Sequence, residues 1–206
     1  MADARLAQGE RAALCDLLVE LGPEATTLCE GWSTADMAAH LVVRERRPDS
    51  GPGLVLTALA HYTDRVRTSA RDSAPFTDLI ARVRSGPPML LRPFDEAVNT
   101  VEFFIHVEDI RRAQEGWEPR SLSPELADAL WKRVGARGMA KKVPATIEVS
   151  APGRTTKVSG SGPRLVVEGD PGELIMFGAG RQSAARVNVT GDADLVTQLR
   201  TASLGV

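Results

Sequence analysis

Residues 99–113 read NTVEFFIHVEDIRRA, and this stretch decides the architecture expected for the N-terminal part of the chain. From Val101 to Val107 every residue is apolar except Glu102 and His106. A helix that is apolar on most of its sides is normally buried, so the stretch predicts a core helix of a helical bundle. Glu102 and His106 are four residues apart and share one face of that helix. An unpaired buried carboxylate is costly, which calls for a partner elsewhere in the chain.

Helical periodicity covers the first two thirds of the chain. Apolar residues recur at helical spacing, and Gly, Pro and Ser mark the ends of the runs. Ser33 is a natural N-cap with Asp36 in the first turn that follows, and Ser123 precedes a proline at a first helical position. The predicted helices cover Leu6–Leu21, a segment from Ser33, Leu54–Arg71, Phe76–Val83, a segment from near Phe94, and a segment from Ser123.

The pattern changes after Lys142. Short runs that alternate or are rich in β-branched residues, separated by Gly, Pro and Asp, predict strands at 145–150, 155–159, 164–168 and 186–190. Helical segments are expected at 173–178 and 193–201. The fold class is therefore α+β, with a helical domain over residues 1–142 and a small α+β domain over residues 143–206.

Composition excludes several classes of function. The formal net charge is −2 and the pI is about 6.0, so there is no basic surface of the kind that binds nucleic acid. The N-terminus lacks the pattern of a signal peptide, and no apolar run approaches the roughly 18 residues of a membrane span. Two cysteines, Cys15 and Cys29, form no disulfide framework. We expect a cytoplasmic protein in which both thiols are reduced and structural.

Only two other histidines can complete a site with Glu102 and His106. His40 lies in MAAHLV, an apolar turn, whereas His61 is followed by polar residues that suit an exposed helix face. A surface pair at i and i+4, or a hydrogen-bonded core histidine, would each explain one of these residues by itself. Two semi-buried histidines and a glutamate on two helices of one bundle together favour an open metal site, with His40, Glu102 and His106 as ligands.

Two polar residues share the ligand face of the 99–113 helix. Asn99 precedes Glu102 by three residues, and Asp109 follows His106 by three. A carboxylate that accepts the second ring N–H of a ligand histidine fixes the orientation of that ring. We expect Asp109 to do this for His106 or His40. A salt bridge from Asp109 to Arg112 or Arg44 is the competing interpretation.

These residues resemble a known family. The segment WSTADMAAHL (32–41) is similar to the tryptophan-to-histidine motif of the mycothiol-dependent maleylpyruvate isomerase family, and Glu102, His106 and Asp109 are similar to its second metal motif. The family belongs to the DinB-like four-helix metal-binding superfamily, and the fuller segments resemble most closely an actinobacterial metal-binding branch. Segments 168–174 and 177–181 resemble its small C-terminal domain, which has a sterol-carrier-like fold. The resemblance thus covers nearly the whole chain.

The resemblance implies a cofactor and a cosubstrate. The metal would be a divalent cation, zinc by default with nickel, iron or manganese as alternatives, and the cosubstrate would be mycothiol. A thiol bound to a metal loses its proton readily and becomes a nucleophile. Asp109 and Arg181 are the candidate catalytic residues. Arg181 follows a Gly-Ala-Gly turn, where it could contact an anion or simply bond the carbonyls of a helix end.

Three functions remain open from sequence. The first is a mycothiol-dependent transferase or isomerase acting on a small electrophile, as a monomer or homodimer without nucleic-acid or membrane partners. The second is a non-catalytic metal-binding module whose C-terminal domain holds an apolar ligand or a partner. The third is metal-assisted hydrolysis, for which Asp109 and Glu108 are the only nearby candidates for the general base.

Overall fold

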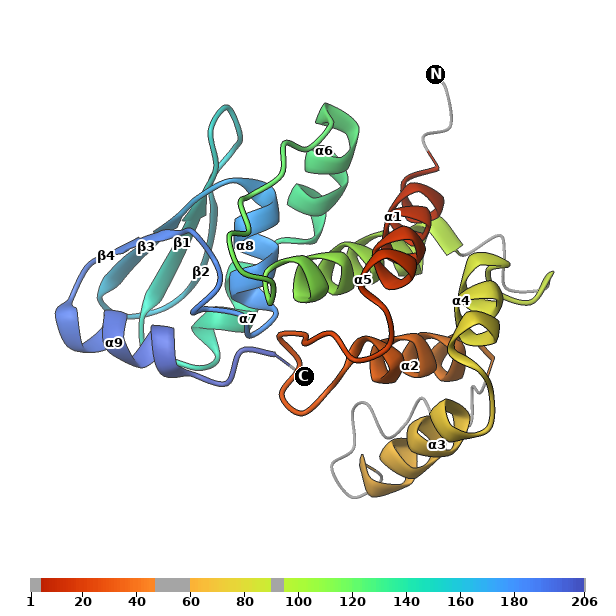
Figure 1. The fold of residues 1–206 in the computed structure, drawn as a ribbon. Helices are drawn as coiled ribbons and strands as arrows, with labels where there is room; N and C mark the ends of the chain where they lie inside the picture. Colours follow the sequence, from red (N-terminus) through yellow and green to blue (C-terminus); the bar gives the residue numbers. More distant parts are fainter. Residues whose placement is uncertain (1–4, 47–59, 90–94, 206) are drawn as a thin grey trace. The chain divides into compact units, whose positions relative to one another are not determined.

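The structure is a computed structural model that describes residues 5–46, 60–89 and 95–205 (Figure 1). It confirms an α+β protein: helices occupy the first part of the chain, and a four-stranded sheet with further helices occupies the second. The chain divides into two compact units, Met1–Pro119 and Arg120–Val206. Among the described residues, no helix is long and apolar enough to span a membrane.

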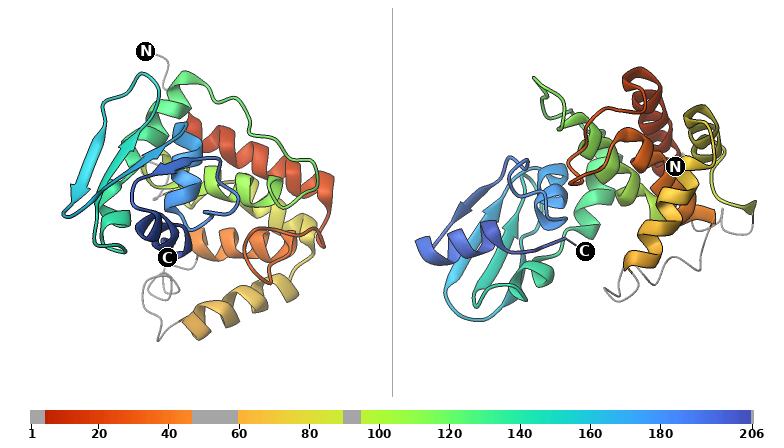
Figure 2. Two further views of the ribbon diagram at one scale, coloured as in Figure 1. Left: turned by 90° about the vertical axis from the view of Figure 1, so that its left-hand side faces the viewer. Right: turned by 60° about the horizontal axis from the view of Figure 1, so that its bottom comes forward.

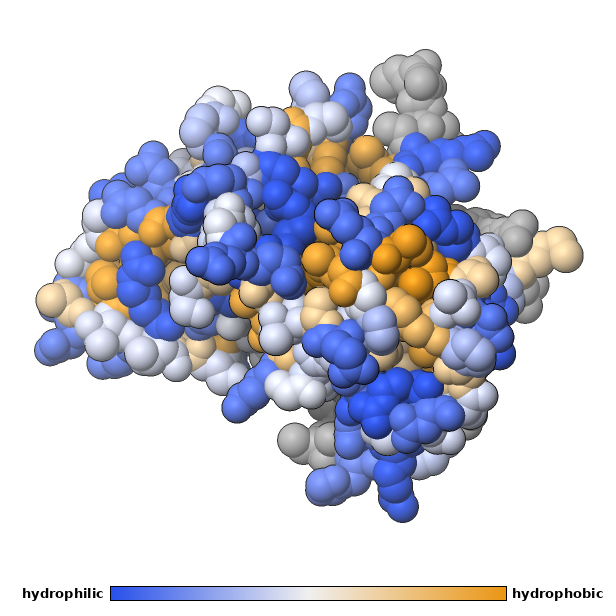
Figure 3. Space-filling view, in the orientation of Figure 1, coloured by the Kyte–Doolittle hydropathy of each residue, from blue (hydrophilic) through white to orange (hydrophobic). Residues whose placement is uncertain are grey.

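The N-terminal unit is helical. Its helices are α1 (Leu6–Leu21), α2 (Thr34–Arg46), α3 (Ala60–Asp72), α4 (Phe76–Arg84) and α5 (Asp95–Arg111). Helix α1 packs against α5 and α4, while α2 packs against α3 and α4. Helix α3 is largely polar, and Figure 3 shows hydrophilic side chains covering it. The fully buried core of the unit includes Leu14, Leu18, Met37, Leu41, Leu79, Phe103, Val107 and Ile110.

Reciprocal capping fixes the start of α2. The Ser33 backbone N–H and hydroxyl both donate to Asp36 Oδ2, at 3.1 and 2.9 Å. This is a capping box with Asp in place of the usual Glu. Asp36 also pairs with Arg67 and Arg71 of α3. Seven consecutive residues of α2, from Met37 to Val43, are buried, and His40 lies in the middle of that buried run.

The C-terminal unit contains the sheet. Its elements are α6 (Pro124–Arg133), α7 (Ala136–Ala140), β1 (Thr146–Ser150), β2 (Lys157–Gly160), β3 (Arg164–Glu168), α8 (Pro171–Gly178), β4 (Asn188–Thr190) and α9 (Ala193–Thr201). The strand order is β2-β1-β3-β4, in which β1 and β3 are parallel and the outer pairs antiparallel. Helix α7 contacts β1 and β2, and α9 lies beside β4 (Figures 1 and 2). The alternating burial of β1 and β3 explains why these strands were predictable.

The division between the units lies earlier than the sequence predicts. The predicted boundary falls between residues 142 and 143, whereas the compact units meet between Pro119 and Arg120. The difference arises because α6 packs against α8, and α7 packs against β1 and β2. Helical periodicity assigns α6 to the preceding helices, but periodicity does not identify the surface that a helix covers. Helix α7 is not predicted, and residues 54–59 and 94 of the predicted helices lie outside the described residues.

Helix α6 begins as predicted and offers a test of its cap. Ser123 accepts a hydrogen bond from the Leu126 backbone N–H at 3.2 Å, and Pro124 occupies the first helical position. Replacing Ser123 by Ala should lower the free energy of unfolding of the C-terminal unit by about 1 kcal/mol, because one backbone donor loses its partner. Urea unfolding followed by circular dichroism measures this loss. A change below about 0.3 kcal/mol would show that solvent replaces the cap fully.

Candidate metal centre

Three predicted ligands come together in the N-terminal unit. His40 projects from α2, and Glu102 and His106 project from α5. Glu102 Oε1 is 3.2 Å from His106 Nε2 and 3.8 Å from His40 Nε2. The two imidazole rings meet nearly edge to face, with centroids 5.3 Å apart. Residues 62 positions apart in the sequence thus direct their ligand atoms to one point.

The spacing of these atoms suits a metal ion. Zinc binds histidine nitrogen and carboxylate oxygen at about 2.0–2.2 Å, so the donor atoms of a tetrahedral site lie about 3.3–3.6 Å apart. The two measured separations bracket that range, and all three ligand atoms lie within 4.8 Å of one another. The donor set of two imidazoles and one carboxylate is typical of zinc and of other first-row divalent metals. Three protein ligands leave a coordination position for a further ligand.

Burial and neighbouring charges shift the pKa values of the three candidate ligands. Burial lowers the pKa of His40 and so favours the neutral imidazole. Burial acts to raise the pKa of Glu102, but hydrogen bonds from His106 and His40 outweigh it and hold that pKa far below its usual value. Burial also opposes protonation of His106, yet bonds to Asp109, Cys29 and Glu102 raise its pKa well above the ordinary value. A divalent cation at Nε2 would replace a proton there.

The side chain of Glu102 is the most exposed of the three. It is 29% exposed, against 10% for His40 and 9% for His106. Solvent therefore reaches the cluster on the Glu102 side, while the two imidazoles are enclosed. A further ligand of an ion at this cluster would therefore approach from the Glu102 side.

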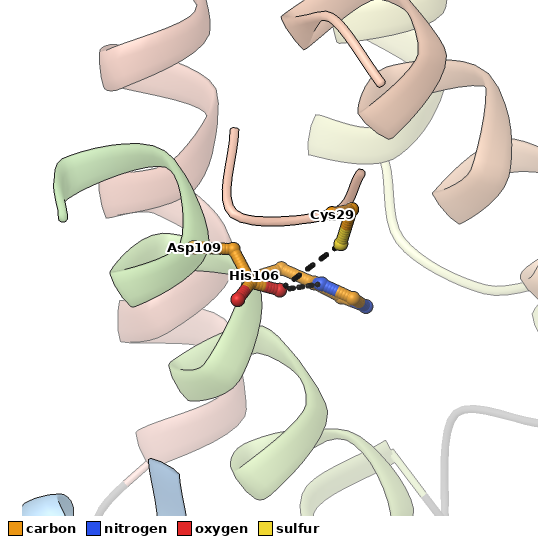
Figure 4. Close-up of side chains that lie close together, drawn as sticks. All are labelled: Cys29, His106 and Asp109. Carbon is orange, nitrogen blue, oxygen red and sulfur yellow. Dashed lines mark hydrogen bonds and ion pairs between the residues drawn. The ribbon is translucent and has the colours of Figure 1, made fainter. Parts of the chain in front are cut away.

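Asp109 holds the far side of His106. Its Oδ2 lies 3.0 Å from His106 Nδ1, and the Asp109 side chain is completely buried (Figure 4). An N–H donated from Nδ1 leaves Nε2, the nitrogen beside Glu102, for a metal. The contact predicted between Asp109 and a ligand histidine is present; Arg44 pairs with Glu102, and Arg112 pairs with Glu108.

Sequence reasoning missed one member of this group. Cys29, expected to be a structural thiol, donates from Sγ to Asp109 Oδ2 at 3.4 Å (Figure 4). Cys29, His106 and Asp109 form a second cluster whose ligand atoms lie within 4.8 Å of one another. The available signal was its position in the chain, because Cys29 precedes the tryptophan-to-histidine motif by three residues.

Trp32 supports His40 from the other side. The two rings are 5.1 Å apart with an interplanar angle of 53°. The guanidinium of Arg67 lies 4.7 Å from the centre of the Trp32 ring and also pairs with Asp36. Trp32 is thus held between a cation and a ligand histidine, which restricts the movement of the His40 ring.

Arg44 links the cluster to a buried polar network. Its Nε is 3.0 Å from Glu102 Oε1, and its Nη1 donates to the side-chain oxygen of Asn99. Asn99 in turn donates to Asp95 Oδ1 at 2.6 Å. Asn99 lies on the predicted face but reaches Glu102 only through Arg44. The guanidinium therefore orients the ligand carboxylate.

The remaining predicted residues lie elsewhere. Glu108 is fully buried and pairs with Arg111 and Arg112 at 2.9 and 2.7 Å. Because Glu108 and Asp109 are both buried and bonded to other side chains, neither suits the general base that metal-assisted hydrolysis needs.

Arg181 belongs to the C-terminal unit, where its Nη1 donates to the Ala179 carbonyl at 2.6 Å. That bond matches the helix-end alternative, and the catalytic role of Arg181 stays a prediction.

The two cysteines differ in accessibility, which gives a labelling prediction. Burial raises the pKa of the Cys15 thiol to about 11, and its side chain is inaccessible in the core. Because the thiolate is the reactive form, native protein at pH 8 should incorporate at most one equivalent of iodoacetamide, at the half-buried Cys29. Mass spectrometry of tryptic peptides measures the distribution. Modification of Cys15 in the native state would contradict this core packing.

Comparisons with known proteins identify the fold. No protein-family model matches the chain, and no curated protein matches it either. Among solved structures, the chain is similar to the crystal structure of the mycothiol-dependent maleylpyruvate isomerase, with a TM-score of 0.54 over 90% of each chain. The sequence identity is 14%. At this identity the likeness shows that the chain shares the fold of that isomerase.

Proposed function

We propose that the protein binds one divalent metal ion, zinc by preference, through His40, Glu102 and His106, and uses it to activate a low-molecular-weight thiol. The observation that carries this proposal is the convergence of the three ligand atoms at spacings that suit a tetrahedral ion, in a cluster open on one side. The fold shared with a mycothiol-dependent isomerase supports it. On this basis mycothiol is the thiol, and the reaction is a transfer or isomerisation of a small electrophile.

Each residue around the proposed ion has a separate role. A bound divalent cation lowers the pKa of a thiol that contacts it, so the thiolate forms near neutral pH. Asp109 accepts a hydrogen bond from Nδ1 of His106, which leaves Nε2, beside Glu102, as the nitrogen that would bind the ion. Trp32 restrains the ring of His40, and Arg44 orients the Glu102 carboxylate. The exposed side of Glu102 is where thiol and electrophile would enter.

The finer structural assignments belong to the same proposal. The helical unit corresponds to a DinB-like four-helix bundle, and the C-terminal unit to a small sterol-carrier-like domain. We propose a cytoplasmic, actinobacterial protein, monomeric or homodimeric, without nucleic-acid or membrane partners. Asp109 acts through His106, and Arg181 is proposed as an anion contact for the substrate.

Thiol use is tested by thermal unfolding of the zinc-loaded protein with and without mycothiol, followed by mycothiol consumption with a panel of activated alkenes, epoxides and alkyl halides. A ligand that binds the folded state raises the unfolding midpoint. We expect mycothiol to raise the midpoint of the zinc-loaded protein but not of the metal-free protein. Stoichiometric zinc binding without a midpoint shift or turnover would favour the non-catalytic metal-binding module instead.

A further inference from the structure

A single turn before α2 contacts His40 and the carboxylate that holds His106. The Trp32 backbone N–H donates to the Cys29 carbonyl at 2.9 Å, which closes a four-residue turn from Cys29 to Trp32. Gly31 has a φ of +74°, a conformation that a residue with a side chain rarely adopts. At one end of this turn Trp32 packs on His40, and at the other Cys29 reaches the carboxylate that holds His106.

The turn is attached to α5 beside the cluster. The Leu28 backbone N–H donates to the Asp109 carbonyl at 2.9 Å. Leu28 is the residue before Cys29, so this bond ties the chain next to Cys29 to the backbone of Asp109. The Thr27 hydroxyl accepts from the Cys29 backbone N–H at 3.1 Å. These bonds fix the backbone on both sides of the Cα of Cys29. The backbone therefore holds the Cβ of Cys29 in place, and in the rotamer observed its thiol lies 3.4 Å from Asp109 Oδ2.

One oxygen of Asp109 receives both donors. Oδ2 lies 3.0 Å from His106 Nδ1 and 3.4 Å from Cys29 Sγ. A second donor on the same oxygen restricts where that oxygen can lie relative to the imidazole. The hydrogen bond from the thiol also makes Oδ2 a weaker acceptor for the His106 N–H. The carboxylate therefore raises the basicity of the His106 ring by less than it would without the thiol.

We infer that Cys29 is a positioning residue of the metal centre, acting on His106 through Asp109. This inference rests on the proposed metal site at His40, Glu102 and His106. The uncharged thiol serves as a hydrogen-bond donor and does not bind the ion. The alternative is that Cys29 binds the ion directly, together with Asp109 and His106 Nδ1. That arrangement would need a thiolate, and the ion would displace the proton that Nδ1 donates to Asp109.

The test is a cobalt(II) titration of the metal-free full-length protein and four variants: Cys29→Ala, Cys29→Ser, Asp109→Asn, and Cys29→Ala with Asp109→Asn. Cys15→Ala is the matched control, since it removes the other thiol, which lies in the core. Visible absorption reports cobalt at the site, and near-ultraviolet absorption reports a cobalt–thiolate bond. Thermal unfolding of each metal-free variant shows whether it is folded.

Loss of an outer partner of a ligand histidine typically weakens metal affinity by about 10–100-fold, and Cys29 acts one step further away. We therefore expect Cys29→Ala to weaken cobalt affinity by about 3–10-fold, Cys29→Ser to restore it to within about twofold, and Cys15→Ala to leave it unchanged. In the Asp109→Asn background, Cys29→Ala should have no additional effect, because both act through one oxygen. No near-ultraviolet thiolate band should appear.

Two results would overturn the inference while leaving the metal site intact. Equal cobalt affinity of the wild type and a folded Cys29→Ala variant would show that the thiol positions nothing. A near-ultraviolet thiolate band that Cys29→Ser removes would make Cys29 a ligand. Absence of cobalt binding in the wild-type protein would be different, because it would overturn the proposed metal site as well.

Discussion

Replacement of Glu102 by Gln will abolish tight zinc binding and leave the helical unit folded. Oε1 of Glu102 is the atom shared by the cluster, since it faces both histidines and the guanidinium of Arg44. Gln has nearly the same shape, but its neutral amide is a far weaker ligand for zinc than a carboxylate. We expect the affinity for zinc to fall by at least about 100-fold, because loss of an outer partner of a ligand already costs about 10–100-fold and Glu102 is itself a proposed ligand.

Thermal and urea unfolding measure the same loss independently. At a free zinc concentration about 1,000 times the wild-type dissociation constant, zinc should stabilise the wild-type protein by about 4 kcal/mol. A 100-fold weaker Glu102→Gln variant should gain at most about 1.4 kcal/mol at the same zinc concentration. Glu20→Gln is the matched control, because Glu20 is exposed on α1 and should bind zinc like the wild type. Stoichiometric, tight zinc binding by a folded Glu102→Gln variant would exclude this carboxylate as a ligand.

The largest loss of stability is expected from Arg11→Met. Arg11 is buried on α1, pairs with Glu45 at 2.7 Å and with Asp95 at 2.8 Å, and lies over the ring of Phe103. Its removal leaves the buried Glu45 carboxylate without its cation, and burial already raises the pKa of that group. Breaking a buried ion pair on one side typically costs about 3–5 kcal/mol, and urea unfolding of the metal-free protein measures this value.

A double variant shows whether the stability loss of Arg11→Met comes from the unpaired charge of Glu45 or from lost packing. One oxygen of Glu45, Oε2, has no hydrogen-bond partner among the described residues, so this ion pair is incompletely satisfied. Replacing both members, as Arg11→Met with Glu45→Leu, removes the uncompensated charge and should recover most of the loss. If the double variant is less stable than Arg11→Met alone, the cost comes from packing, and the buried charge is not its cause.

Local patterns predicted much of the helical unit and the core of the site. The apolar surroundings of Glu102 and His106 indicate a buried helix, and their spacing places them on one face; α5 has both properties. His40 was predictable because it lies within the apolar run of α2. In these cases the signal is contained in one helix, where periodicity directly reports burial.

The contacts that Cys29 and Arg44 make with distant residues were not predictable. Cys29 and Asp109 are 80 residues apart, and no local pattern relates a loop thiol to a helix carboxylate. The same holds for Arg44, whose contact with Glu102 depends on how α2 and α5 cross. The packing of α6 is a related case, since its sequence shows an apolar stripe but not that α8 covers it.

The most direct test of the central claim is an anomalous difference map at the zinc absorption edge, from crystals of the zinc-loaded full-length protein. Two clusters share His106 and differ in which ring nitrogen faces the ion. The account predicts one strong peak within about 2.0–2.2 Å of His40 Nε2, Glu102 Oε1 and His106 Nε2, with Asp109 still bonded to Nδ1. A peak among Cys29, Asp109 and His106 Nδ1, or none at either cluster, would contradict it.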